Sequence, residues 1–220
     1  MAAHLGRSGH KKDLTDMDEA GLIKDAIRGD LDAFNRLVLT YQEMAFNLAF
    51  RMLDDETAAE DATQNAFISA YRHIGGFRGG SFKAWIMRMV TNSCYDELRR
   101  LHRRPTVPLE PLHVEDEEEI ESPSWLADNQ PSAEDEIEIQ ELEKAIQHCI
   151  AELPVEFRAV VVMIDVQGFN YSEAAQAIGH PLGTIKSRLA RARMRLRICL
   201  SGFGELLPSS FRLGEEAEFS

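Results

Sequence analysis

The stretch covering residues 171–200 constrains the fold of this chain more than any other part of it. The spacing of its apolar residues predicts a short helix over residues 171–178, with Ser172 placed to cap it. Gly179 is typical of a residue that ends a helix, and Pro181 prevents that helix from continuing. A longer helix is expected to follow. A short helix, a tight turn with glycine and a longer second helix form the helix-turn-helix pattern.

The second helix of this pattern combines an apolar stripe with an opposite face that has basic edges. At 100° per residue, the stripe expected to face the core contains Ile185, Leu189, Ala192 and Leu196. Residues 174–200 hold six Lys or Arg and no Asp or Glu, although the whole chain has a net charge of −13. Small residues between basic ones suit a helix that enters a DNA groove and contacts phosphates. A solvated basic helix is the plainer alternative, but the turn pattern and the missing acids favour DNA binding.

Charge is segregated along the chain, so its acidic total does not exclude nucleic-acid binding. Residues 78–104 hold seven Lys or Arg against two acids, and residues 105–143 hold fourteen acids and no Lys or Arg. A second basic block begins at Lys186. The order basic, acidic, basic indicates two nucleic-acid-binding parts separated by an acidic connection.

Apolar residues recur at three and four positions through most of the chain, which predicts an all-α protein with two helical domains. Residues 105–133 contain five of the eight prolines and the acidic run 115–121, a composition that cannot form a core. Fully extended, this linker spans roughly 100 Å. The predicted organisation is a disordered N-terminus at 1–15, a first domain at 16–104, an acidic linker at 105–133, a second domain at 134–200 and a C-terminal tail at 201–220.

The three cysteines, Cys94, Cys149 and Cys199, are far apart in the sequence and odd in number. None lies in a CxxC pair or beside a metal-ligand histidine, so we expect reduced thiols, no disulfide, no metal site and no cofactor. The chain has no run of about 18 apolar residues and no apolar core near its N-terminus. We therefore expect a cytoplasmic protein without membrane insertion.

Two blocks of the sequence resemble those of a known family. Residues 59–67, a Phe-Arg-Gly loop and the strings FKAWIMRM and DELRR resemble region 2 of bacterial sigma factors. Leu153-Pro154 and the string GHPLGTIKSRLARAR, with its preceding helix, resemble region 4. The resemblance covers about residues 20–104 and 135–200. Two such domains without a third between them are similar to the small extracytoplasmic-function group.

The resemblance implies that the helix over residues 57–73 binds a coiled coil of core RNA polymerase. The matching residues are Asp61, Gln64, Asn65 and Phe67. Several relatives have a larger apolar residue at the position of Ala62 and a Glu at the position of Asn65, which leaves the details of polymerase binding open. The acidic linker resembles linkers that thread polymerase channels; a solubilising spacer is the alternative.

The resemblance also implies promoter-binding roles for both domains. The glycine-rich loop at residues 73–81 is expected to capture a base flipped from the −10 element, and the basic helix after it to contact the same element. The −10 candidates are Phe77, Arg78, Arg88, Asn92 and Arg99. The −35 candidates are Thr184, Lys186, Ser187, Arg188, Ala190, Arg191 and Arg193, among which the methyl group of Ala190 suits contact with a thymine methyl.

These observations lead us to expect a sigma factor and not an enzyme, with core RNA polymerase and promoter DNA as partners. We also expect an anti-sigma factor, because two helical domains with apolar faces on a long tether can be clamped together. One alternative is a stand-alone helix-turn-helix transcriptional regulator, in which residues 57–73 would have no role. Another is an enzyme that holds magnesium on the carboxylates of residues 115–121, which lack the rigid scaffold that such a site needs.

Overall fold

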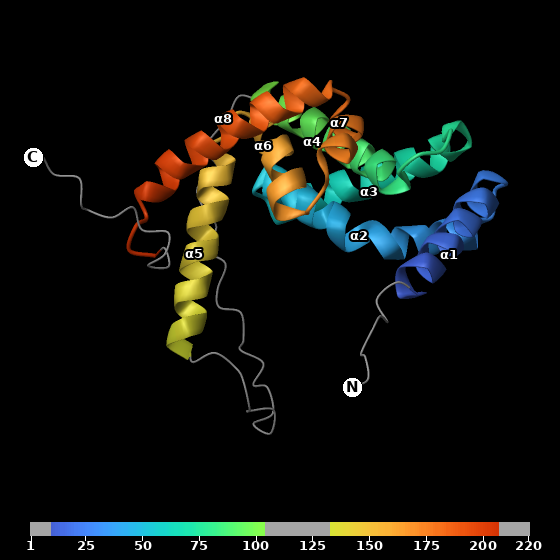
Figure 1. Cartoon of the computed structure of the whole chain (residues 1–220), viewed down its shortest axis with the longest axis horizontal. Helices are drawn as coiled ribbons and strands as arrows, with labels where there is room; N and C mark the ends of the chain where they lie inside the picture. The colour runs from blue at the N-terminus through green and yellow to red at the C-terminus, as the bar shows by residue number, and fades with distance from the viewer. Residues whose placement is uncertain (1–9, 104–132, 207–220) are drawn as a thin grey trace, which may run out of the picture.

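The computed structural model describes residues 10–103 and 133–206, and all regular elements in these ranges are helical (Figure 1). The first group contains α1 (His10–Ile27), α2 (Leu31–Leu53), α3 (Glu56–His73), the 3-10 turn η1 (Ile74–Gly76) and α4 (Phe82–Arg103). The second group contains α5 (Ala133–Ala151), α6 (Val155–Val161), the π-helical turn η2 (Val162–Val166), α7 (Tyr171–Ile178) and α8 (Leu182–Ser201). The predicted all-α class is confirmed.

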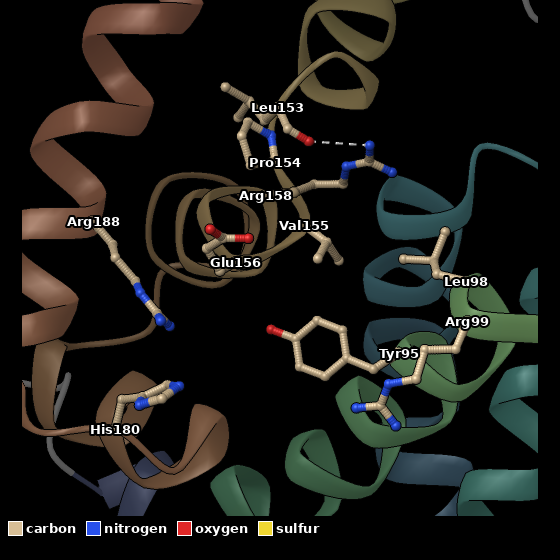
Figure 2. Close-up of a pocket in the computed structure, with 10 residues that line it drawn as sticks. All are labelled: Tyr95, Leu98, Arg99, Leu153, Pro154, Val155, Glu156, Arg158, His180 and Arg188. Carbon is tan, nitrogen blue, oxygen red and sulfur yellow. Dashed lines mark hydrogen bonds between the residues drawn. The ribbon is translucent and has the colours of Figure 1, made fainter. Parts of the chain in front are cut away.

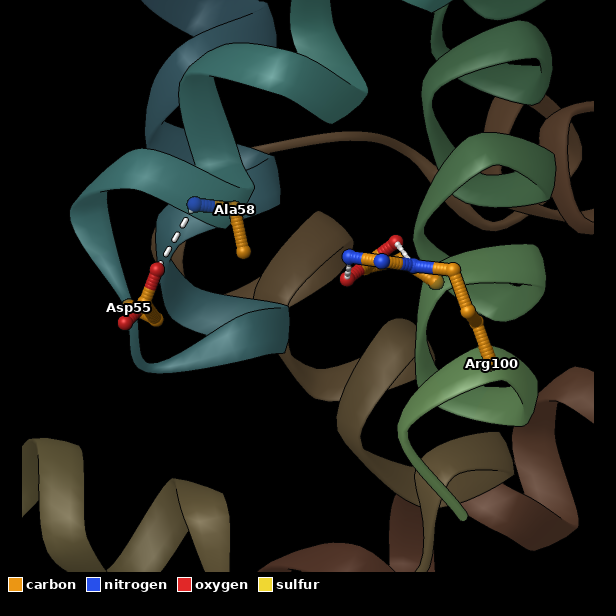
Figure 3. Close-up of polar contacts among 4 residues, drawn as sticks. Asp55, Ala58 and Arg100 are labelled. Carbon is orange, nitrogen blue, oxygen red and sulfur yellow. Dashed lines mark hydrogen bonds and ion pairs between the residues drawn. The ribbon is translucent and has the colours of Figure 1, made fainter. Parts of the chain in front are cut away.

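Short polar side chains start the helices of the first group. The Asp30 carboxylate accepts hydrogen bonds from the first backbone N–H groups of α2. Asp55 does the same for α3, where its Oδ1 lies 2.7 Å from the backbone nitrogen of Ala58 (Figure 3). Ser81 accepts from the backbone N–H of Ala84 at the start of α4. Each cap satisfies a donor that the first turn of a helix leaves without a partner.

A stripe of alanines on α3 allows α2, α3 and α4 to pack closely. The stripe contains Ala59, Ala62, Ala66 and Ala70, all of which are buried. The helices that contact α3 contribute larger buried side chains, among them Leu48 of α2 and Met87 of α4. Small residues on one helix and large ones on the next let the surfaces interdigitate at high density.

The helix-turn-helix forms as predicted, with one correction at its first residue. Asn170, and not Ser172, caps α7, because its Oδ1 accepts from the backbone N–H groups of Ser172 and Glu173. The Glu173 carboxylate in turn accepts from the backbone N–H of Asn170, which completes a capping box. Gly179 ends α7 with a φ of 75°, a left-handed conformation that glycine adopts without strain.

The two helical groups lie directly against each other, and their buried apolar residues form one continuous core. Helix α4 contacts α7, and α2 contacts α5 and η2. Arg158 of α6 donates hydrogen bonds to the carbonyl oxygens of Met52 in the first group and of Leu153 in the second. Gln167 Nε2 donates to the carbonyl oxygen of Met44 at 2.8 Å. Burial lowers the pKa of Arg158, and the acids around it oppose this effect.

Two further polar contacts join the groups. Gln147 of α5 accepts a hydrogen bond from Arg51 at 3.1 Å and donates one to the Asp54 carboxylate at 2.8 Å, both from the end of the first group's α2. The Lys83 ammonium of α4 lies 3.9 Å from the centre of the Phe169 ring, which is buried next to the helix-turn-helix. This distance is within the range of a cation–π interaction.

The structure corrects the prediction of three reduced cysteines. Cys149 of α5 and Cys199 of α8 form a disulfide, with their Cα atoms 5.7 Å apart. Their separation of 50 residues hid the pair, because sequence spacing does not show which helices become neighbours. Cys94 in α4 is the free cysteine, and burial raises the pKa of its thiol to about 12.

The boundaries of the groups differ from the predicted ones at the N-terminus. Helix α1 begins at His10, whereas residues 1–15 were expected to be disordered. No glycine or proline occurs between His10 and Ala20, and the lysine, leucine and glutamate residues there favour a helix even without an apolar stripe. The predicted linker lies outside the described residues except for Ala133, and the tail is described only as far as residue 206.

Candidate DNA and polymerase interface

Helix α8 presents the residues predicted to contact the −35 element. Its core side is buried at Ile185, Leu189 and Ala192, whereas Leu196 is half-buried. On the other side the structure leaves Lys186, Ser187, Ala190, Arg191 and Arg193 exposed and Thr184 and Arg188 half-buried. The helix thus keeps a narrow face of small residues with basic side chains along both edges, an arrangement compatible with a helix in a DNA groove.

Some of the basic side chains on α8 already have partners within the protein. The Arg193 guanidinium forms a two-pronged ion pair with the carboxylate of Asp165 in η2, at 2.9 and 2.5 Å. The hydrogen bond to Asp165 raises the pKa of Arg193. Lys186 lies over the ring of Tyr171, 5.8 Å from its centre. A phosphate that binds Arg193 has to replace Asp165 or share the guanidinium with it.

The glycine-rich loop holds one of its two predicted −10 residues inside and one outside. Phe77 is half-buried, with its ring edge-on to those of Phe82 and Trp85 at 5.4 and 5.5 Å between centroids. Arg78 is exposed and donates a hydrogen bond to the Gly75 carbonyl oxygen at 3.2 Å. The loop is therefore anchored by its aromatic residue, and its guanidinium is the more accessible group.

Arg88 and Arg99, two of the −10 candidates on α4, lie beside the second group. The guanidinium of Arg88 lies against Gly179 in the turn of the helix-turn-helix. Arg99 pairs with Asp96 at 2.7 Å, and Asn92 is exposed between these two arginines.

A cavity of about 460 Å³ lies where α4 faces α6, α7 and α8 (Figure 2). Tyr95 and Arg188 point into it from opposite sides, and Arg99 also lines it. Burial raises the pKa of the Tyr95 hydroxyl, and the nearby charge of Arg188 partly opposes that shift. Arg99 and Arg188, which were predicted to contact different promoter elements, thus line one cavity.

The predicted polymerase-binding residues line a groove of about 600 Å³ between α2 and α3. Asp61, Gln64 and Phe67 are among its lining residues, whereas Asn65 is exposed outside the lining. Ala62 is buried at 3% exposure, so it packs inside the helical group and not on this surface.

The sequence analysis missed the α2 side of this groove and much of the cavity beside α4. Val38, Gln42, Glu43 and Phe46 form the α2 side of the groove. Periodicity shows which face of a helix is apolar but not which helix lies beside it, so these residues gave no sign of a functional role. His180 and Tyr95 of the cavity gave no signal, since Tyr95 lies in α4 and His180 in the turn before α8, far apart in the sequence.

Comparison with known proteins shows which family the two helical groups resemble. A model of Sigma-70 region 2 matches residues 37–104, and a model of Sigma-70 region 4 matches residues 143–196. The ECF RNA polymerase sigma factor SigM of Mycobacterium tuberculosis is 36% identical over 179 residues, which cover 81% of this chain and 82% of SigM. The chain belongs to the extracytoplasmic-function sigma factors.

Other members of the family are similarly close to this sigma factor. The RNA polymerase sigma-H factor of Pseudomonas aeruginosa is 35% identical over 82% of this chain and 92% of its own length. The ECF RNA polymerase sigma factor SigW of Bacillus subtilis is 33% identical over 80% of this chain and 92% of its own. Sigma factors are transcription initiation factors, so the expected function class is confirmed at that level.

Two solved structures share the fold of this sigma factor. CnrH, solved in complex with the cytosolic domain of CnrY, has a TM-score of 0.60 and 23% identity, with 84% of this chain and 98% of CnrH covered. RpoE of Bartonella quintana, solved with the anti-sigma factor NepR, has a TM-score of 0.55 and 23% identity, with 77% of this chain and 98% of RpoE covered.

Among the helices that the structure describes, none has the length and apolar character needed to cross a membrane.

Proposed function

We propose that this sigma factor binds core RNA polymerase in the cytoplasm, recognises −35 and −10 promoter elements and promotes transcription initiation. The observation that carries the proposal is the exposed basic face of α8. It follows, along the chain, a region 2 in which α3 borders an open groove. Catalysis then belongs to the polymerase. This chain contributes binding, position and the capture of melted DNA.

In this proposal, α8 enters the major groove of the −35 element. The small residues Ser187 and Ala190 let the helix approach the bases, and Arg191 and Arg193 meet phosphates on the two sides of the groove. Thr184, Lys186 and Arg188 lie one turn nearer the start of the helix. That end of a recognition helix reaches deepest toward base edges.

Region 2 has two roles in the proposal. The groove between α2 and α3 receives a polymerase helix, with Asp61, Gln64 and Phe67 on one wall and Asn65 beside them. The loop and α4 contact the −10 element through the remaining predicted residues: Phe77, Arg78, Arg88, Asn92 and Arg99. Because Phe77 packs on Phe82 and Trp85, we assign it the support of the loop and assign Arg78 the first contact with DNA.

The closed arrangement of the two groups does not match a promoter-bound form. Elements named −35 and −10 lie about 25 base pairs apart, roughly 80–90 Å along a duplex with 34–36 Å per turn. Arg99 and Arg188, assigned to different elements, line one cavity of about 460 Å³. We infer that the groups separate before promoter binding. A 29-residue connection is long enough for this, because it can span roughly 100 Å.

We also propose control by an anti-sigma factor. CnrH was solved with CnrY, and RpoE of Bartonella quintana with the anti-sigma factor NepR. The closed form of this sigma factor offers such a partner one continuous unit to hold, which keeps its two DNA-binding surfaces together. The test is co-purification followed by addition of the recovered protein to a transcription assay. A recovered protein that leaves transcription unchanged contradicts this part of the proposal.

Run-off transcription with purified core polymerase on a pool of genomic promoters tests the main proposal. We expect new specific transcripts that share −35 and −10 sequences, and none without this protein. Arg191→Ala should weaken binding to the −35 duplex for all sequences and lower the slope of log affinity against log salt by about 1. Tight duplex binding without any transcript would favour the stand-alone regulator instead.

A further inference from the structure

We propose that Cys149 and Cys199 form a reversible dithiol–disulfide site that reacts with small-molecule thiols and disulfides and sets the stability of the α5–α8 group. The disulfide joins the first and last helices of that group. Most cytoplasmic disulfides in mesophiles are transient, catalytic or redox-sensing, whereas permanent structural ones belong to oxidising compartments. The cytoplasmic setting is part of the proposed function, but the exchange reaction itself does not depend on it.

The two sulfur atoms differ in accessibility, which gives the exchange a direction. Cys149 is buried at 1% exposure, and Cys199 is half-buried near the end of α8. After Cys199, α8 ends at Ser201, and within the described residues a turn follows in which the Phe203 ring meets the ring of the exposed His148 at 5.9 Å. An incoming thiolate therefore reaches the sulfur of Cys199 more easily than that of Cys149.

Reduction proceeds in two balanced exchange steps. A small thiolate attacks Sγ of Cys199, the bond between the two cysteines breaks, and Cys149 leaves as a thiolate that takes up a proton. A second small thiolate then attacks the sulfur atom of the first small molecule in its mixed disulfide with Cys199. This releases the Cys199 thiolate, which is protonated, and one molecule of small disulfide. Two electrons pass from two small thiols to the protein, and oxidation by the small disulfide is the exact reverse.

The position of the site explains why its state matters for the whole group. Six basic residues lie along α8 from Lys186 to Arg197, and Cys199 follows them, so the disulfide fixes the far end of that helix on α5. The covalent link closes a long loop that includes α6, α7 and most of α8. Closing such a loop restricts the unfolded chain and so favours the folded group.

Cys94 provides an internal control for this site. It lies in α4 of the other group, is fully buried, and has a thiol pKa raised to about 12 by that burial. A thiol with so little thiolate exchanges slowly and stays reduced while the protein is folded. The full-length protein should therefore show two reactive cysteines and one unreactive cysteine.

The test is a redox titration of the full-length protein in buffers with graded ratios of reduced to oxidised glutathione. Free thiols are trapped with a maleimide and counted by mass before and after unfolding, and thermal unfolding is recorded at both ends of the series. We expect two thiols to appear together within the series, with the third trapped only after unfolding. The oxidised form should unfold at least about 5 °C higher than the reduced form.

Variants separate the redox site from a general effect of thiols. In Cys149→Ser and in Cys199→Ser we expect no paired transition and no difference in unfolding temperature between the two buffers. Cys94→Ala should keep both. Three results would overturn the proposal. The disulfide could stay oxidised when the folded protein is in reduced glutathione, it could fail to form at all, or a stable glutathione adduct on Cys199 could form in its place. An unfolding temperature independent of the buffer would do the same.

Discussion

The two helical groups of this sigma factor hold their structure by different means. The first group has long helices, with 23 residues in α2 and 22 in α4, and a buried alanine stripe that brings them close together. The second group relies on two much shorter inner helices, α6 with 7 residues and α7 with 8. The second group also has an internal disulfide, and it forms several hydrogen bonds with the first group.

The difference follows from size and from the position of the DNA-facing surface. A group of about 70 residues buries too small a fraction of its surface for its core alone to give a wide margin of stability. One side of α8, which we propose faces DNA, also stays exposed and adds nothing to that core. A cross-link and docking onto a larger neighbour compensate for both deficits. The following predictions test this contrast.

The largest effect is expected for Leu189→Ala in α8. The side chain is 2% exposed, and its removal should lower the free energy of unfolding of the second group by about 2–5 kcal/mol. Urea unfolding followed by circular dichroism measures the change. Ile198→Ala on the same helix, where the side chain is 67% exposed, is the matched control and should change stability little. Equal effects of the two variants would contradict the packing of α8 described above.

A smaller effect is expected for Arg158→Ala. The change leaves the carbonyl oxygens of Met52 and Leu153 without this donor in a partly buried setting. We expect it to lower the free energy of unfolding by about 1–3 kcal/mol. Because Arg158 joins the two groups, we expect their unfolding to separate into two transitions. Trp85 fluorescence reports on the first group, and Arg100→Ala, which removes only an exposed ion pair with Glu97, is the control (Figure 3). A single transition in both variants would show that Arg158 does not couple the groups.

The free energy of unfolding of the first group should fall modestly as the pH becomes alkaline. Burial raises the pKa of Cys94 from 9.0 to about 12, so the unfolded state loses this proton first and stability falls as pH rises between these values. The slope attributable to this thiol is at most about 1.4 kcal/mol per pH unit. Tyr95, whose pKa burial also raises, adds to the loss above pH 10. Urea unfolding at several pH values should show a reduced slope in Cys94→Ala, and an unchanged slope would contradict the assignment.

The smallest effect is expected for Asp165→Asn at the edge of the second group. The variant frees Arg193 from an ion pair in which 55% of the arginine side chain is exposed. Binding of a −35 duplex should become tighter by about 0.2–1 kcal/mol, the usual range for such exposed pairs. Fluorescence anisotropy with a labelled duplex measures this. Asp96→Asn, which frees Arg99 in the first group in the same way, should leave −35 binding unchanged.

Elements that depend on local patterns were predictable from the sequence. The helix-turn-helix, the Asp30 and Ser81 caps and the alanine stripe of α3 follow from spacing and side-chain chemistry within a few residues. The exposed face of α8 follows from the same periodicity, because a helix with one apolar stripe leaves the opposite side in solvent.

Features that depend on which helices become neighbours were not predictable. The Cys149–Cys199 disulfide joins two cysteines that are 50 residues apart in the sequence, and the cavity beside Tyr95 forms only where α4, α6, α8 and the turn at His180 meet. The α2 wall of the groove, at Val38 and Phe46, was recognised as helical but not as a surface, because periodicity carries no information about partners. Local caps also compete, as the choice of Asn170 over Ser172 shows.

The continuous core between the two groups has a consequence for how much protein a cell needs. If promoter binding requires separated groups, the apparent dissociation constant equals the intrinsic one divided by the separated fraction. Each 1.4 kcal/mol that holds the groups together then raises the concentration needed for half-occupancy about tenfold. Under that condition, contacts such as the hydrogen bond from Gln167 to Met44 raise the protein concentration that promoter occupancy needs. At lower concentrations the protein is present but most promoters stay empty.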